Sequence, residues 1–455
     1  MISLPRDFAL SVDLYELTMV DAYLREGLTE PSVFSLFARR LPQGRAFLVA
    51  CGLDDAIDAL ENLSFSAESI SYLASLCLFS DSLLDWLRAF RFQGDVFAIP
   101  EGTCVFPNEP VLEVVASLPQ AQLVETLVMN QLHVPTVAAS KAARMVLAAG
   151  ARRLVDFGLR RTHGIDAGLK VARAAYLAGF EGTSNVLAGQ RYGIPVVGTM
   201  AHSYVLAHGD ELSAFRAFVR AFPTATLLVD TYDTLEGVRN VIRLAEELGK
   251  DFKVKGVRLD SGDLVMLAAK ARQLLDSARL TQVEIFASSG IDEREILRCV
   301  AARAPIAGFG VGASLAASSD APSLDMAYKL VAYAGQGRMK LSPEKENLPM
   351  QKQVFRINRG GRTERDILAS HEERLEGKPL LVQFTSAGRR VSPPAALESV
   401  RERVRSELAQ LPEEIRSLDT PPRPFRVELS PKLASLRQKL ASELSGGPLH
   451  SGDRT

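Results

Sequence analysis

Residues able to bind or react recur after a series of short apolar runs between residues 153 and 316. Each run has the length of a buried strand. A lone Asp after a strand is more often a helix N-cap than a catalyst, but seven such ends are hard to explain by capping alone. The residues that follow the seven runs are Asp156, Phe157, Arg160 and Arg161; Thr183, Ser184 and Asn185; His202; Asp230 and Asp233; Arg258, Asp260, Ser261 and Asp263; Ser288, Ser289 and Gly290; and Gly310 and Gly312.

The glycines and arginines of this set predict anion binding. Gly290, Gly310 and Gly312 let backbone N–H groups approach a phosphate closely, and helix starts add positive potential. The arginines can hold a carboxylate or phosphate through two hydrogen bonds. An isolated Gly-x-Gly would indicate a tight turn, but paired phosphate loops on the last strands are a known use of the β/α barrel.

The other members of the set complete a site for a planar anion, a sugar and phosphates. Phe157 offers an aromatic face to a flat ring. Asp230 and Asp260 can bind ribose hydroxyls, or Mg²⁺ together with substrate phosphates. His202 is one of six histidines, and its imidazole could attack phosphorus and carry the phosphoryl group. The alternative for His202 is a buried histidine with a hydrogen bond that fixes its tautomer.

Alternating strand-length and helix-length patterns must position these residues. About seven β-α units in a row imply a parallel sheet, whose chemistry collects at the carboxyl ends of the strands. A barrel-like closure is favoured over an open doubly wound sheet, because no single G-x-G-x-x-G dominates the first turn. The expected strands are "RLVDFG", a weaker "GFEGTS", "IPVVGTM", "TLLVD", "KGVRLDS", "VEIFASS" and "IAGFGVG".

The flanking regions predict a second, strand-rich domain. A helix is expected over residues 14–26, with Asp13 as N-cap and Glu16 in a capping box. The pattern over 120–150 predicts a long helix broken at Pro135. Further expected elements are a strand in "PSVFSLFARRLP", a helix in "GLDDAIDALENL", strands over 94–118, and later strands in "YKLVAY", "RMKLS", "QVFRI" and "KPLLVQF".

Three domains follow from these patterns. Residues 1–118 form a helical and strand-rich domain completed by about 325–395, and 119–324 form the barrel-like domain. Residues 396–455 form a C-terminal extension, with a surface helix broken by proline over 396–418 and disorder in the last dozen residues.

Composition excludes several classes of protein. The 455 residues are 47% hydrophobic, with a formal net charge of −1, so nothing draws the whole chain to nucleic acid or an anionic membrane. No apolar run of about 18 residues predicts a membrane span, and no signal-peptide pattern opens the sequence. Cys51, Cys77, Cys104 and Cys299 lack metal-binding spacing and are expected to be buried thiols in a reducing compartment. The predicted location is cytoplasmic.

Several motifs together closely resemble the nicotinate phosphoribosyltransferase family, from about residue 10 to 360 and in the family's order. The resemblance implies an α/β fold with an incomplete, irregular β/α barrel, a smaller strand-rich α/β domain and a homodimer with shared active sites. It also implies a ligase-type enzyme of NAD biosynthesis that joins nicotinate to phosphoribosyl pyrophosphate, with ATP hydrolysed through a phosphohistidine. The motifs are "DLYELTMVDAYLREG", "FARRLPQGR", "VDFGLRRTHGIDAGLKVARAAYLAGFEGTSNVLAG", "GTMAHSYV", "VDTYDTLEGV", "VRLDSGDL" and "KLSPEKENLPMQKQVFR".

The resemblance also implies roles for individual residues. His202 is the phosphoacceptor, and Phe157 stacks on the pyridine ring while Tyr15 of the other subunit covers its second face. Asp13 lies beside Tyr15. The implied ligands of the carboxylate, ribose, phosphates and Mg²⁺ are Arg160, Thr183, Asp230, Arg258, Asp260, Ser289, Gly290, Gly310 and Gly312. Arg40, Lys340 and Lys352 are candidate ligands for pyrophosphate or ATP, with a solvated surface charge as the alternative.

Two positions bear on the family assignment. Related nicotinamide-using enzymes have an aspartate where this chain has Ser184; because serine can donate to a carboxylate, it favours nicotinate. The family often has Pro-Gly where this chain has Pro349-Met350, and Met adopts a positive φ less readily than Gly. The conformation of this loop and the role of Lys352 are therefore open.

Two other functions compete with this assignment. Quinolinate phosphoribosyltransferase shares the fold, but needs more basic residues and has no need of His202. A ligand-binding relative without turnover is the second alternative, and the completeness of the predicted site argues against it.

Overall fold

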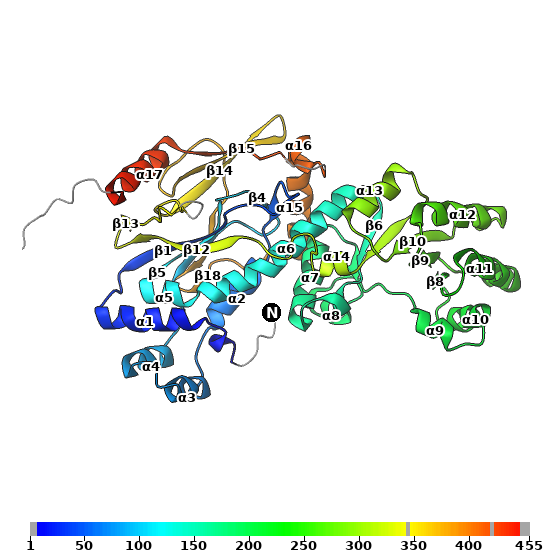
Figure 1. Ribbon diagram of the computed structural model, residues 1–455, viewed down its shortest axis with the longest axis horizontal. Coiled ribbons are helices and arrows are strands. Elements are labelled where there is room, and N and C mark those ends of the chain that lie inside the picture. The colour runs from blue at the N-terminus through cyan, green and yellow to red at the C-terminus, as the bar shows by residue number, and fades with distance from the viewer. Residues whose placement is uncertain (1–6, 343–345, 419–422, 446–455) are drawn as a thin grey trace, which may run out of the picture. The chain divides into compact units, whose positions relative to one another are not determined.

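The computed structural model describes residues 7–342, 346–418 and 423–445 and divides into two compact units (Figure 1). The sheet unit comprises Met1–Val137 and Ser323–Thr455, and the half-barrel unit comprises Ala138–Pro322. The borders thus lie at 137/138 and 322/323, where the sequence predicted 118/119 and 324/325. The described residues after 396 belong to the sheet unit rather than to a third domain, and residues 446–455 of the predicted disordered tail lie outside the described residues.

The half-barrel unit contains a six-stranded parallel sheet in the order β7-β6-β11-β10-β9-β8. This order is that of a ring in which β6 follows β11, and the ring is open between β7 and β8, so the half-barrel is incomplete. In the middle of the sheet, Ala287 pairs with Leu259 on one side and Phe309 on the other. The strands are β6 (Arg153–Asp156), β7 (Gly182–Thr183), β8 (Thr226–Leu228), β9 (Gly256–Leu259), β10 (Glu284–Ser288) and β11 (Gly308–Val311).

The predicted strand "IPVVGTM", residues 194–200, is wrong. This segment makes one isolated bridge, between Val196 and Thr183, and the side of Val196 away from β7 has no strand partner. Val196 is 53% exposed, and Pro195 cannot donate to a ladder. His202 therefore does not follow a strand. It is the first residue of the short helix α9 (His202–Leu206).

Helices follow the strands of the half-barrel, as the alternation predicted (Figure 1). Side chains of Asp233, Asp263 and Asp292 cap three of them by accepting a backbone N–H in the first turn. These three acids are thus explained by capping, whereas Asp230 and Asp260 are not. The helices are α7 (Ile165–Ala178), α8 (Val186–Tyr192), α10 (Glu211–Ala221), α11 (Thr234–Leu248), α12 (Leu264–Ser277), α13 (Glu293–Ala301) and α14 (Ala313–Ala316).

The helix α6 (Glu125–Ala149) runs through Pro135, so the predicted break there is wrong. The preceding helix α5 (Leu118–Leu123) ends instead before Glu125. Next to the proline, the Thr136 hydroxyl donates to the Cys51 carbonyl and accepts from the Cys51 amide. Tertiary packing thus holds the helix together where an isolated helix would break.

The sheet unit is built on a seven-stranded sheet in the order β13-β12-β1-β5-β3-β17-β18, beside a four-stranded sheet β16-β14-β15-β19 and the pair β2-β4. Strands from both ends of the chain therefore share a sheet, as predicted. The predicted strand "RMKLS", residues 338–342, is wrong. The hairpin partner of β12 is the two-residue strand β13, which ends just before residue 338. The strands are β1 (Pro31–Ala38), β2 (Leu48–Val49), β3 (Asp95–Ala98), β4 (Cys104–Val105), β5 (Pro110–Ser117), β12 (Met326–Tyr333), β13 (Gln336–Gly337), β14 (Lys352–Arg359), β15 (Arg362–Ser370), β16 (Lys378–Pro379), β17 (Val382–Ser386), β18 (Arg389–Arg390) and β19 (Val427–Leu429).

The helices expected over 14–26, in "GLDDAIDALENL" and over 396–418 are present, whereas the helices over 67–75, 81–88 and 431–444 were not predicted. The break between α15 and α16 lies at the predicted proline. The predicted capping box at α1 is wrong: Asp13 makes no side-chain cap, and Glu16 accepts instead from the amide and hydroxyl of Thr126. The helices are α1 (Leu14–Glu26), α2 (Leu53–Asn62), α3 (Ala67–Ser75), α4 (Asp81–Arg88), α15 (Leu397–Gln410), α16 (Glu413–Arg416) and α17 (Pro431–Leu444).

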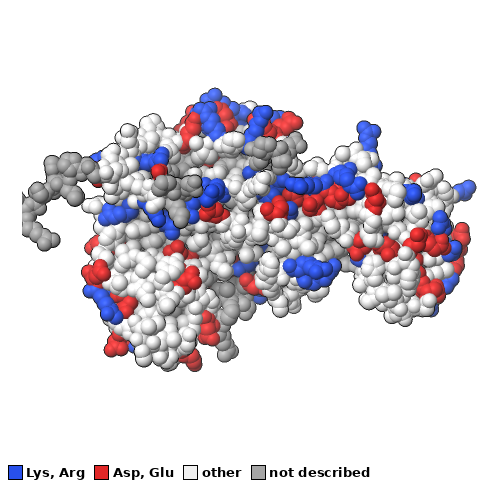
Figure 2. All heavy atoms as spheres, in the orientation of Figure 1, with Lys and Arg blue, Asp and Glu red and all other residues white. Residues whose placement is uncertain are grey.

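Charge and cysteine placement add two observations. Lys and Arg lie side by side with Asp and Glu on the face drawn in Figure 2, so positive potential for an anion must arise locally. Cys51, Cys104 and Cys299 are buried free thiols, but Cys77 is exposed, contrary to prediction. Within the described residues, no helix is long and apolar enough to cross a membrane.

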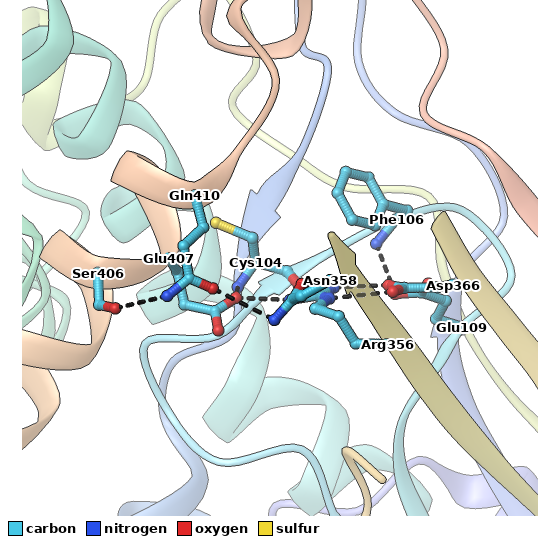
Figure 3. Close-up of polar contacts among 9 residues, drawn as sticks. All are labelled: Cys104, Phe106, Glu109, Arg356, Asn358, Asp366, Ser406, Glu407 and Gln410. Carbon is cyan, nitrogen blue, oxygen red and sulfur yellow. Dashed lines mark hydrogen bonds and ion pairs between the residues drawn. The ribbon is translucent and has the colours of Figure 1, made fainter. Parts of the chain in front are cut away.

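A buried ion-pair network joins α15 to the four-stranded sheet (Figure 3). Arg356 on β14 makes two hydrogen bonds with the Asp366 carboxylate on β15, at 3.0 and 2.6 Å, and a third of 2.5 Å with Glu407 on α15. It also donates to the Cys104 carbonyl. Burial and the neighbouring Asp366 raise the pKa of Glu109 well above its ordinary value. The network satisfies a guanidinium that is almost fully buried.

Replacing Arg356 with Met is expected to lower the free energy of unfolding by about 3–5 kcal/mol, because Asp366 and Glu407 would remain as buried charges without a partner. Urea denaturation measures this change. Arg405→Met removes the exposed pair between Arg405 and Glu402 and should leave the transition unchanged. Equal midpoints for the two variants would contradict the prediction.

Candidate active site

A cavity of about 830 Å³ lies at the carboxyl ends of the half-barrel strands. It gathers ten of the predicted site residues from six separate segments of the chain. These ten are Phe157, Arg160, Ser184, His202, Arg258, Asp260, Ser289, Gly290, Gly310 and Gly312. The cavity is also lined by Arg161, Thr199, Ser288, Asp292, Ser314 and Ser319.

His202 has a defined partner on each side of its ring. Nδ1 lies 3.1 Å from the hydroxyl of Thr231, which follows β8. Nε2 lies 3.7 Å from Oδ2 of Asp260, which follows β9. The side chain is 40% exposed. When Nδ1 carries the proton and donates to Thr231, Nε2 keeps its lone pair, so the imidazole can act as a nucleophile.

The two carboxylates after β8 and β9 have different surroundings. Asp260 accepts a hydrogen bond from the Ser288 hydroxyl on one oxygen and turns the other towards His202. Asp230 accepts from the Asp260 amide at 2.9 Å and from the Ser261 hydroxyl at 2.6 Å. Asp230 is not among the residues lining the cavity. Its visible role is therefore to hold the loop that presents Asp260.

The ring of Phe157 has space because position 310 is glycine. A Cβ atom at Gly310 would lie 2.5 Å from two ring carbons of Phe157. The Phe157 amide donates to the Val311 carbonyl at 2.7 Å, which fixes the backbone of the aromatic residue against β11. Gly310 was predicted as part of a phosphate loop, but the structural need for glycine at this position is the passage of the ring.

Asp156 organises the exits of β6 and β7 from below the cavity. It is 1% exposed, and its carboxylate accepts from the Gly158 amide and the Thr183 hydroxyl, both at 2.7 Å. Burial raises its pKa. Thr183, predicted as a substrate ligand, is fully buried in this pair and does not line the cavity. Its neighbour Ser184 does, and the Ser184 amide is held by the Asp156 carbonyl.

Three arginines supply positive charge to the cavity. Arg258 projects from β9 and donates to the Thr199 hydroxyl. Burial lowers the pKa of Arg258, and the carboxylates of Asp260 and Asp230 oppose that fall. Arg160 and Arg161 end the short turn Leu159–Arg161 after β6. A carboxylate or phosphate in the cavity would meet more positive than negative side chains.

Of the three glycines predicted to form phosphate loops after β10 and β11, only Gly290 has the positive φ that favours glycine. Ser289 and Gly290 both adopt positive φ, 70° and 63°, and a non-glycine residue in this region is held there by its surroundings. Gly312 has φ −109° and does not need to be glycine for that reason. The helix after it, α14, has only four residues, so it adds little dipole.

The other predicted site residues belong to the sheet unit. Asp13 accepts a 3.1 Å hydrogen bond from the Thr126 hydroxyl, and Tyr15 is 46% exposed. Partial burial, together with the carboxylate of Glu125, raises the pKa of Tyr15. Arg40 forms an ion pair of 3.0 Å with Asp325. Lys340 is exposed.

Lys352 is fully enclosed by the sheet unit. Its ammonium group lies 3.0 Å from the Glu113 carboxylate and donates to the carbonyls of Met350 and Leu348. With these partners it does not support the predicted contact with pyrophosphate or ATP. Met350 adopts φ 65°, so this chain uses the left-handed conformation at a position where the resemblance suggested glycine.

Three sequence profiles match this chain in order. They describe the N-terminal domain of nicotinate phosphoribosyltransferase over residues 10–133, the family itself over 152–340, and its C-terminal domain over 373–437. A curated relative from Mycobacterium tuberculosis, nicotinate phosphoribosyltransferase pncB2, is 51% identical over 444 residues, which are 96% of each chain. The chain belongs to the nicotinate phosphoribosyltransferase family.

Two further relatives support the family assignment. Nicotinate phosphoribosyltransferase from Bacillus subtilis is 41% identical over 83% of this chain and 79% of its own. The crystal structure of human nicotinic acid phosphoribosyltransferase superposes with a TM-score of 0.85 at 31% identity, covering 94% of this chain and 99% of that one. The fold is shared more widely. A nicotinate-nucleotide pyrophosphorylase from Pyrococcus furiosus has a TM-score of 0.74 at 24% identity, covering 90% and 98% of the two chains.

Two functional candidates were missed from the sequence, and the place of a third, Asp156, needed the structure. Thr199 and Thr231 lie within the quoted motifs "GTMAHSYV" and "VDTYDTLEGV", but a lone threonine carries no signal of its own. Their hydroxyls bind Arg258 and His202. Asp156 was noted, and its placement beneath the loops needed the structure. The family motifs were the one signal that could have singled these residues out.

Proposed function

We propose that this chain joins nicotinate to phosphoribosyl pyrophosphate, giving nicotinate mononucleotide and pyrophosphate, with ATP hydrolysed through a phosphohistidine at His202. The observation that carries this proposal is the convergence of an aromatic face, a nucleophilic imidazole and cationic side chains on one cavity. The residues are Phe157, His202, Arg160 and Arg258. Curated relatives at 51% and 41% identity carry the name of the same enzyme.

The bond-making step needs little acid–base chemistry from the protein. The pyridine nitrogen forms a bond to the anomeric carbon of the sugar, while the bond from that carbon to pyrophosphate breaks and pyrophosphate leaves with the electron pair. Phe157 positions the flat ring, and Arg258 and Arg160 attract the carboxylate and phosphates. Asp260 lines the cavity, where its carboxylate can accept a hydrogen bond from a ribose hydroxyl.

His202 would couple ATP to this reaction. Its free ring nitrogen forms a bond to the γ-phosphorus of ATP and ADP leaves; water later cleaves the phosphoryl–nitrogen bond, giving phosphate and restoring the imidazole. The added charge can order neighbouring loops around the substrates. Thr231 and Asp260, on either side of the ring, would hold its orientation.

Magnesium is the metal that this reaction would use. Mg²⁺ typically takes one or two carboxylates and completes its shell with water and substrate phosphates. Asp260 lines the cavity and would be the ligand that faces the phosphates; Asp230, behind it, keeps one buried oxygen without a hydrogen-bond partner and could complete such a partial site. No cluster of three or more acidic, His or Cys ligands occurs in the described part of the chain. The metal would neutralise the pyrophosphate leaving group.

A homodimer in the cytoplasm is the proposed setting. Leu14 and Tyr15 are apolar or aromatic and exposed at the start of α1, as expected for residues that a second copy covers. Tyr15 would then reach the partner's pyridine site. Light scattering coupled to gel filtration, compared between wild type and Tyr15→Ala, tests the dimer and the role of Tyr15 separately.

Turnover assays with purified protein test the proposed function. Nicotinate mononucleotide should form from nicotinate, phosphoribosyl pyrophosphate and Mg²⁺, and faster when ATP is added. Replacing nicotinate with quinolinate should give no product. If quinolinate gives product and nicotinate does not, the chain is the rival transferase. If the substrates bind and neither gives product, the chain is a ligand-binding relative without turnover.

Replacing Ser184 with Asp is expected to lower kcat/KM for nicotinate by about 10- to 100-fold, because a second carboxylate would face that of the substrate. The ratio of nicotinamide to nicotinate turnover should rise. Ser184→Asn, which adds similar bulk without charge, should lower nicotinate turnover less. Steady-state kinetics with both bases measure the change, and an unaltered ratio in Ser184→Asp would show that Ser184 does not face the carboxylate.

A further inference from the structure

A buried lysine outside the cavity joins the two loops that bear the predicted phosphate-binding residues. Lys141 lies on α6 and its side chain is 2% exposed. Its ammonium group is 2.5 Å from a carboxylate oxygen of Glu293 and 2.7 Å from one of Asp320. Glu293 is the first residue of α13, directly after the loop 289–292. Asp320 lies four residues after the end of α14, the short helix that Gly312 precedes.

Lys141 shares the carboxylate of Glu293 with a second cation. Arg144, three residues further along α6, donates to the other carboxylate oxygen of Glu293 at 3.1 Å. Although burial alone would raise it, the neighbouring Lys141 holds the pKa of Glu293 below its ordinary value. Two cations thus face two carboxylates, and one of these, Glu293, directly follows the loop 289–292, which is predicted to bind phosphate. Without the cations, these carboxylates would repel an anion.

The same two loops are also joined on the cavity side. The Ser314 hydroxyl donates to the Ile291 carbonyl, and both residues line the cavity. Each loop contains a non-glycine residue with positive φ, Ser289 at 70° and Ser318 at 43°. Such conformations persist where the surroundings over-determine them, and the ion pairs of Lys141 supply part of that constraint.

We propose that Lys141 is a positioning residue that fixes the loops after β10 and β11 in one arrangement for binding the ribose 5-phosphate part of the substrate. Lys141 does not line the cavity, so it acts through Glu293 and Asp320 rather than on the ligand. This inference rests on the proposed function, because that function supplies the phosphoribosyl substrate.

The test uses Lys141→Met, Lys141→Arg and a matched control. Lys170 is equally buried, at 3%, and pairs with Asp166 at 3.0 Å within α7, so Lys170→Met also removes a buried lysine but not the tie between the loops. Lys141→Met should raise the KM for phosphoribosyl pyrophosphate about tenfold or more, with a smaller change in the KM for nicotinate. Lys141→Arg should restore most of the affinity, and Lys170→Met should not change either KM.

Direct binding separates this inference from the proposed activity. Calorimetric titration with ribose 5-phosphate, without nicotinate or ATP, should show weaker binding to Lys141→Met and, by about threefold or more, to Asp320→Asn. Asp320→Asn keeps the buried pair between Lys141 and Glu293, so it remains informative if Lys141→Met does not fold. Unchanged affinity in Asp320→Asn, or equal losses in Lys141→Met and Lys170→Met, would overturn the proposal. Absence of turnover in wild type would instead overturn the proposed function and leave the binding result standing.

Discussion

His202→Ala is expected to remove both the acid-labile phosphate adduct and the stimulation by ATP, leaving the slower synthesis seen without ATP. If ATP binding and substrate binding are coupled to the usual extent, kcat/KM measured with ATP should fall by about 5- to 150-fold. The cause is the loss of the ring nitrogen that faces the cavity between Thr231 and Asp260. Intact mass after incubation with ATP, together with initial rates with and without ATP, measures both effects.

His208→Ala is the matched control for this experiment. His208 lies six residues further on and its Nδ1 contacts the Tyr204 carbonyl at 2.8 Å, so its ring is held locally and away from the cavity lining. This variant should keep the adduct and the ATP stimulation. If His202→Ala behaves like wild type and ATP has no effect on either, His202 is a structural residue.

Gly310→Ala is expected to lower kcat/KM for nicotinate by about 100-fold, because the new methyl group would displace the Phe157 ring from its position. The overlap with ring carbons at 2.5 Å should also cost about 1–3 kcal/mol of unfolding free energy, as overpacking does. Initial rates at varied nicotinate and urea denaturation measure the two effects separately. Gly209→Ala, at a loop position where a methyl group meets nothing within 4 Å, controls for the loss of a glycine.

A double-mutant cycle identifies the ring as the cause. Phe157→Leu replaces the ring with a smaller side chain, so adding Gly310→Ala to Phe157→Leu should cost little further activity. Additive losses would mean that Gly310 does not act through Phe157 but through the backbone, a ligand or Phe286, whose ring a Cβ atom would approach to 3.1 Å.

The strand exits could be predicted from the sequence because their signal is local. Short apolar runs separated by amphipathic helices indicate a parallel sheet, and the sheet then brings its carboxyl ends together. Nine of the ten predicted residues that line the cavity are there for that reason, and His202, which follows no strand, is the exception. The run at 194–200 failed because a strand also needs partners on the sheet, and Pro195 and an exposed Val196 give no local sign of whether they exist.

The other errors come from contacts between distant parts of the chain. Glu16 matches a capping box but accepts from Thr126, 110 residues later. Pro135 has the signature of a helix break, yet Thr136 contacts Cys51 and α6 continues. Lys352 was a candidate phosphate ligand with a solvated charge as the alternative, and the structure supplies Glu113 as its partner. Local patterns predict an element and its exposed residues; they do not predict which remote group a buried polar side chain will meet.

The gap in the half-barrel has a consequence for motion. Residues 194–200 lead into His202, and their one strand pairing within the described residues is the bridge at Val196. The bridge has two backbone hydrogen bonds, and Thr199 and Met200 add contacts with Arg258 and the Leu228 amide, so the segment can shift without breaking a longer ladder. Amide protons here should exchange with solvent through local opening, while those of β9 and β10, paired on both sides, should exchange only on wider unfolding. The residue proposed to change its covalent state thus follows a segment with little strand pairing, so a phosphoryl group there would break few backbone hydrogen bonds in moving it.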